Sequence, residues 1–95
     1  MSDDLRKRFD EAVKFINNSK PGSVKLSNSQ KLTFYALFKT ATVGAPNGKR
    51  PSILNLLHRY KYDAWKKVAD AGTTKEEAMQ RFIDEFSKIK PDAKL

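Results

Sequence analysis

The chain has 95 residues, no cysteine and a formal net charge of +8, and these facts exclude several classes of protein. This length has room for one domain with one core, spanning residues 1–95, and without cysteine the fold cannot depend on disulfides or zinc thiolates. Hydrophobic residues make up 39% of the chain, which is too apolar for a disordered tail. No apolar run approaches the roughly 20 residues of a membrane span, and the first residues lack the apolar stretch of a signal peptide. These features favour the cytosol or the nucleus, and of the two we expect a cytoplasmic protein.

The positive charge is concentrated in the middle of the sequence. Residues 13–73 carry eleven basic and two acidic side chains, whereas residues 1–12 and 74–95 are close to neutral. A concentrated excess indicates an anionic partner more than a general solubility charge. The partner could be nucleic acid, anionic lipid or a phosphorylated small molecule.

Helical periodicity predicts the first two elements. A helix over 3–17 places Leu5, Phe9, Ala12, Val13 and Ile16 along one side, and Pro21 with Gly22 ends the pattern. Ser27 and Gln30 have the spacing of a capping box at the start of a helix over 28–43. The apolar side of that second helix carries Phe34, Leu37, Phe38 and Ala41.

Two further helices follow a long turn between Gly44 and Pro51. A helix over 55–69 has Leu57, Tyr60, Ala64, Trp65 and Val68 on its apolar side. Thr74 and Glu77 repeat the capping-box spacing before a helix over 74–90, whose apolar side carries Ala78, Met79, Phe82, Ile83, Phe86 and Ile89. No strand-like alternation occurs, so the sequence predicts a small all-α, four-helix bundle.

Residues for catalysis are scarce. The chain has no cysteine and a single histidine, His58, which lies among Leu57, Arg59 and Lys61 and is expected to be a surface or partly packed side chain. It has no glycine-rich phosphate loop, no HExxH motif and no calcium-loop carboxylates. We expect a protein that is not an enzyme and that has no metal and no cofactor.

Aromatic and cationic side chains share helical faces in the middle of the chain. Tyr35, Phe38 and Lys39 stand at i, i+3 and i+4, and Lys61 lies one turn before Trp65. Rings beside fixed cations suit a purine with a phosphate, because the base stacks while the ammonium groups hold the anionic oxygens. The simpler interpretation makes Phe38, Trp65, Phe82 and Phe86 core residues and the lysines solvated.

Two sequence blocks resemble the signature of the acyl-CoA-binding protein family. The first runs from Tyr35 to Gly44 (YALFKTATVG) and is followed by Pro51, and the second is Lys61 to Lys66 (KYDAWK). The family has Tyr-x-x-Tyr-Lys-Gln-Ala-Thr-x-Gly, a proline seven residues later and Lys-[Trp/Tyr]-x-Ala-Trp, with the same separations. Phe9, the Lys20-Pro21 turn and the segment 74–79 also look like the family, so the resemblance covers nearly the whole chain.

The resemblance implies an up-down-down-up bundle and assigns a binding site. Tyr35, Lys39 and Lys61 match the residues that hold the CoA head group, in particular its adenine and 3′-phosphate. Phe38 and Phe82 stand where the family has tyrosines, so each keeps a ring and lacks a hydroxyl. By analogy with the first two helices of the family, Phe9, Val13, Ile16 and Leu32 are candidates to line a groove for the acyl chain.

The function that the resemblance implies is binding of medium- to long-chain fatty acyl-CoA esters by a non-catalytic, monomeric carrier. Such a carrier has no nucleic-acid partner and at most transient contacts with membranes or with enzymes that use acyl-CoA. The alternative is a small basic helical nucleic-acid-binding domain, although the cations do not gather on one recognition helix. A helical module that binds only proteins is a third interpretation.

Overall fold

Four α-helices form the computed structural model, which describes residues 3–18 and 26–91. They are α1 (Asp3–Asn18), α2 (Asn28–Thr42), α3 (Leu56–Asp70) and α4 (Lys75–Ile89). Each end lies within one residue of the bound expected from the sequence. Helices are the only regular elements in the two described ranges, which confirms the all-α class. The predicted turn at Lys20-Pro21 lies outside these ranges.

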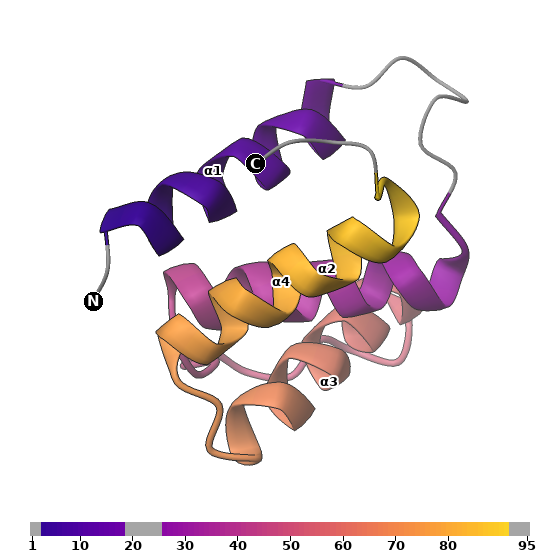
Figure 1. Ribbon diagram of the computed structural model, residues 1–95. Helices are drawn as coiled ribbons and strands as arrows, with labels where there is room; N and C mark the ends of the chain where they lie inside the picture. The colour runs from indigo at the N-terminus through magenta and orange to yellow at the C-terminus, as the bar shows by residue number, and fades with distance from the viewer. Residues whose placement is uncertain (1–2, 19–25, 92–95) are drawn as a thin grey trace.

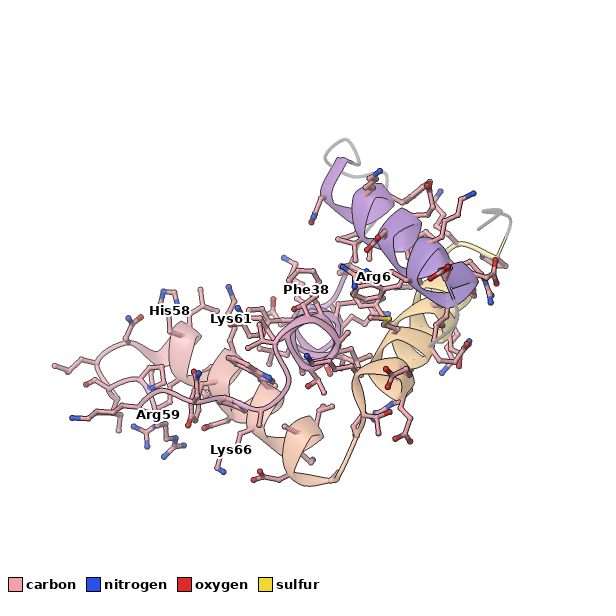
Figure 2. All side chains as sticks on the ribbon, turned by 90° about the vertical axis from the view of Figure 1, so that its left-hand side faces the viewer. Arg6, Phe38, His58, Arg59, Lys61 and Lys66 are labelled. Atoms are coloured by element: carbon pink, nitrogen blue, oxygen red, sulfur yellow. The ribbon has the colours of Figure 1, made fainter. Side chains whose placement is uncertain are left out.

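The helices follow an up-down-down-up path. Figure 1 shows α1 and α4 running in one direction and α2 and α3 in the other, because the connection over residues 43–55 returns along the length of the bundle. α2 packs against both α3 and α4, and α1 packs against α4. In Figure 2, which looks along α2, α3 and α1 lie on either side of it. The bundle is therefore open between α1 and α3, with α2 between them.

The core lies among α1, α2 and α4. Phe82 is its central ring, with centroids 5.2 Å from Phe9 and 4.9 Å from Phe34, both in edge-to-face geometry. The other buried side chains of this cluster are Ala12, Leu37, Ala41, Ala78, Met79, Ile83 and Phe86. They belong to the apolar sides predicted for the first, second and fourth helices, so those stripes form the core.

α3 contributes much less to the core than its sequence suggests. Val68 packs against the core cluster, but α3 has no fully buried residue. Leu57 and Tyr60 on its first turns are 61% and 55% exposed. Leu57 and Tyr60, which lie on the apolar side predicted for this helix, are therefore not part of the core.

Both predicted capping boxes are present. At α2, the Gln30 amide donates to the Ser27 Oγ (3.1 Å), and the Ser27 amide donates to the Gln30 Oε1 (2.8 Å). At α4, Thr74 and Glu77 make the same reciprocal pair at 3.1 Å each. Hydrogen bonding from the Thr74 amide lowers the pKa of Glu77. These caps fix the first residues of two of the core helices.

Thr40 is a buried polar residue of α2 whose substitution should stabilise the protein. Its side chain is 1% exposed, and its Oγ1 has no hydrogen-bond partner. Thr40→Val replaces this hydroxyl with a methyl group of similar shape, so we expect about 1 kcal/mol of added stability in urea unfolding. The exposed Thr42, whose Oγ1 donates to the Phe38 carbonyl, provides the control Thr42→Val. A Thr40→Val protein less stable than the wild type would contradict this interpretation.

Candidate ligand-binding site

Two lysine ammonium groups lie next to one tyrosine ring on the open side of α2. The Lys61 Nζ is 5.4 Å from the centroid of the Tyr35 ring, and the Lys39 Nζ is 6.0 Å from it. All three side chains are half-buried, so water screens their charges less than those of fully exposed lysines. The structure therefore brings together the three residues that the sequence predicts for the head group of the ligand.

Neither of these two cations is neutralised by a carboxylate of the described residues. Among residues 3–18 and 26–91, neither Lys39 nor Lys61 has a carboxylate within ion-pair distance, whereas Lys66 is paired with Asp70 at 3.0 Å. Figure 2 shows Lys61 and Phe38 directed to the same side of the molecule, and Arg59 and Lys66 directed to the other. The side shared by Phe38 and Lys61 thus offers free positive charge beside aromatic rings, an arrangement that suits an anion attached to a flat ring.

A small hollow lies beside Tyr35, between α1, α2 and α4. Its volume is about 180 Å³. The rings of Tyr35, Phe38 and Phe82 line it from two helices, and α1 supplies Val13 and Ile16. The remaining lining residues are Asn17 and Phe34. Its size and apolar walls suit a ring system better than a long chain.

A larger hollow of about 710 Å³ lies between the beginning of α2 and the beginning of α3. Leu32, Leu57 and Tyr60 form its apolar walls, and its other lining residues are Asn28, Lys31 and Lys61. The volume is within the range of about 300–1,000 Å³ that is usual for ligand sites. Lys61 both lines this hollow and contacts the Tyr35 ring, so it connects the apolar hollow to the cation cluster.

The four residues predicted for an acyl groove do not lie together. Phe9 is 1% exposed and sits in the core, with its ring stacked on Phe38 at 6.3 Å. Val13 and Ile16 line the small hollow, and Leu32 lines the large one. Phe82, predicted at the head group, is 3% exposed, so it supports the small hollow from the core side. Leu57 and Tyr60 were not predicted at a site, because apolar spacing does not show that this end of the helix is left exposed.

Trp65 is a further contributor that the sequence analysis treated as a core residue. Its indole N–H donates to the carbonyl of Gly44 at 2.6 Å, and Gly44 has a positive φ of 92° that suits glycine. The Lys39 Nζ lies 5.2 Å from the indole ring. The Trp65 ring is therefore held in place by the loop after α2, and the Lys39 ammonium lies close to this ring as well as to the Tyr35 ring.

The loop over residues 43–55 is tied to α3 by side-chain contacts of Arg50 and Tyr62. Arg50 makes a two-pronged ion pair with Asp63, at 2.6 and 2.8 Å. The Tyr62 hydroxyl donates to the Gly48 carbonyl at 3.2 Å. Tyr62 and Arg50 thus hold the loop against α3, which fixes the helix that carries Lys61.

The ion pair predicts how stability depends on pH. Hydrogen bonding from Arg50 lowers the pKa of Asp63 below its ordinary 3.8. A carboxyl group with a lowered pKa adds stability above its ordinary pKa and loses that contribution as the pH falls through the folded-state value. We expect Asp63→Asn to be less stable than the wild type near neutral pH, and this difference to shrink below about pH 4 in thermal unfolding. A difference that is constant with pH would contradict a role for the ionised carboxylate.

Two other kinds of site were sought in the described part of the chain. No group of three or more histidine, aspartate or glutamate side chains is placed to hold a metal ion among these residues. None of the helices there is long and apolar enough to cross a membrane. The four-helix fold places cations and aromatic rings beside an apolar hollow, an arrangement that suits a helical binding module for a ligand with an anionic, ring-bearing head and an apolar tail.

Comparison with known proteins gives this module a family. The family model described as acyl CoA binding protein matches residues 6–86. Acyl-CoA-binding protein homolog 3 of Caenorhabditis elegans is 44% identical over 90% of this chain and 76% of its own length. The crystal structure of ACBP from Moniliophthora perniciosa has a TM-score of 0.84 and 36% identity, over 99% of this chain and 87% of that one. The chain belongs to the acyl-CoA-binding protein family.

Some relatives are much longer. Acyl-CoA-binding domain-containing protein 5 of Xenopus tropicalis is 42% identical over 86% of this chain, which spans only 18% of the length of that relative.

Proposed function

We propose that this protein binds medium- to long-chain fatty acyl-CoA esters and carries them in the cytoplasm as a monomer, without catalysis. The observation that carries the proposal is the position of Lys61, which contacts the Tyr35 ring on one side and lines the large apolar hollow on the other. An acyl-CoA has the same two parts, a nucleotide head with phosphates and an alkyl tail, joined in one molecule.

The cation cluster supports binding of the head group. CoA carries about four negative charges near neutral pH, on a pyrophosphate and a 3′-phosphate. Lys39 and Lys61 supply charge that no nearby carboxylate cancels among the described residues. The small hollow, lined by Tyr35, Phe38 and Val13, offers ring and aliphatic surface for the adenine. The positive field over residues 13–73 steers the ligand toward this side, more strongly at low salt.

The large hollow supports binding of the acyl tail. Leu32 is the predicted groove residue found there, and Leu57 and Tyr60 complete its apolar surface. Each buried methylene contributes about 0.8 kcal/mol, so a sixteen-carbon tail contributes on the order of 10 kcal/mol before ordering costs. Most of the affinity therefore comes from the tail, and the head group determines which class of thioester binds.

Native mass spectrometry of protein purified from a bacterial host tests this proposal without choosing the ligand in advance. We expect bound species whose masses correspond to acyl-CoA esters, with long tails enriched over free CoA. A gel-shift titration with duplex DNA provides the comparison with the nucleic-acid alternative. Purified protein that carries no acyl-CoA and that shifts DNA in a salt-sensitive manner would overturn the proposal.

A further inference from the structure

Large apolar side chains are exposed at the end of the loop that precedes α3. Leu54 is 95% exposed, Ile53 is 66% exposed and Leu56 is 49% exposed. We call these three residues the apolar tip. Single exposed apolar residues are common on protein surfaces, but adjacent ones that protrude from one loop are typical of an interaction site.

Neither the core nor the large hollow accounts for the apolar tip. The three side chains are outside the core cluster and outside the lining of the hollow, which includes the neighbouring Leu57. Two hydrogen bonds close the turn before α3: the Leu54 amide donates to the Ser52 Oγ at 3.1 Å, and the Asn55 amide donates to the Ser52 carbonyl at 2.9 Å. This turn and the first residue of α3 present the three apolar side chains to solvent.

The charges around the apolar tip indicate what covers it. Residues 44–62 contain four cationic side chains, Lys49, Arg50, Arg59 and Lys61, and no acidic one. Asp63, the first acidic residue after this segment, is ion-paired with Arg50. Figure 2 shows His58 and Arg59 near the end of the molecule farthest from α1. Exposed apolar side chains that lie close in the chain to Lys49 and Arg59, two cations without an ion-pair partner among the described residues, fit the interface of a bilayer that contains anionic lipid.

We propose that the apolar tip docks on the surface of membranes that contain anionic phospholipid, with Ile53, Leu54 and Leu56 entering the headgroup region and Lys49 and Arg59 contacting the phosphates. Leu57 lies next to the tip in the chain and lines the large hollow, so docking brings the mouth of that hollow to the bilayer. Transfer of an acyl chain between hollow and membrane depends in addition on the proposed acyl-CoA binding; docking itself does not.

Sedimentation of ligand-free protein with sucrose-loaded vesicles tests the docking. Vesicles of phosphatidylcholine with 30% phosphatidylserine are compared with vesicles of phosphatidylcholine alone. We expect binding to the anionic vesicles, weakened about tenfold by the double variant Ile53→Ser, Leu54→Ser and also reduced by Lys49→Glu. Val43→Ser is the matched control, because Val43 is an apolar residue 48% exposed at the other end of the same loop.

The outcomes separate the docking from the proposed function. The double variant should keep the helicity of the wild type and its affinity for hexadecanoyl-CoA, because Ile53 and Leu54 lie outside both hollows. Equal binding of wild type and double variant to anionic vesicles would overturn the docking and leave acyl-CoA binding untouched. A concentration-dependent dimer that the double variant abolishes, without vesicle binding, would assign the tip to a second copy of the chain instead.

Discussion

Replacing Lys39 with alanine should weaken the binding of acyl-CoA by more than tenfold while leaving the helical content unchanged. The Lys39 Nζ lies 6.0 Å from the centroid of the Tyr35 ring and 5.2 Å from that of the Trp65 ring, and no carboxylate of the described chain is paired with it. A charge-assisted hydrogen bond to a phosphate contributes about 1.5–3 kcal/mol, which corresponds to roughly a tenfold to hundredfold change in affinity. Titration calorimetry with hexadecanoyl-CoA measures the loss.

Lys66→Ala is the matched control for this substitution. Lys66 is directed to the opposite side of the molecule from Phe38 and Lys61, and its ammonium is paired with Asp70. Both substitutions remove one positive charge from the protein. A purely long-range electrostatic effect on acyl-CoA affinity would therefore appear in both variants. An affinity for Lys39→Ala equal to that of Lys66→Ala would remove Lys39 from the site.

Replacing Phe82 with alanine should reduce the free energy of unfolding by about 3–5 kcal/mol. The Phe82 ring is 3% exposed and contacts Phe9 of α1 and Phe34 of α2, so its loss leaves a cavity where three helices meet. Small domains have a total stability of about 5–15 kcal/mol, and the variant should therefore be close to unfolding at elevated temperature. Urea unfolding followed by circular dichroism measures the change.

Leu57→Ala provides the comparison for Phe82→Ala. Leu57 is 61% exposed, so its truncation should change the free energy of unfolding by less than about 0.5 kcal/mol. The same variant should weaken the binding of long acyl chains, because Leu57 lines the large hollow. Similar losses of stability in both variants would contradict the division between core and binding surface described above.

The core of the fold could be predicted from the sequence because local rules and packing agree there. In the capping boxes at Ser27 and Thr74, the two residues that exchange hydrogen bonds are three positions apart, and this spacing can be read from the sequence. The stripe that carries Phe34 and the stripe that carries Phe82 both face the centre of the bundle. In these elements every residue with helical apolar spacing finds a partner, so periodicity is sufficient.

α3 could not be predicted in the same way, because periodicity gives the direction of a side chain and not what covers it. Leu57 and Val68 share the same apolar spacing, but only Val68 meets the core. Which turns of α3 are covered depends on how far it extends along α2, a tertiary property. The residues predicted for one groove line two different hollows for the same reason: their arrangement depends on tertiary packing. Val13 lies on α1 and Leu32 lies on α2, and the packing of both helices on α4 sets how these two helices are placed.

Titration calorimetry that compares hexadecanoyl-CoA with CoA lacking the acyl chain tests the central claim most directly, namely that Lys61 joins a head-group site to a tail site. We predict one-to-one binding of hexadecanoyl-CoA, at least a hundredfold tighter than that of CoA alone, because even a minor part of the roughly 10 kcal/mol of tail burial exceeds that ratio. Weak binding of both compounds, or equal affinity for the two, would contradict the account.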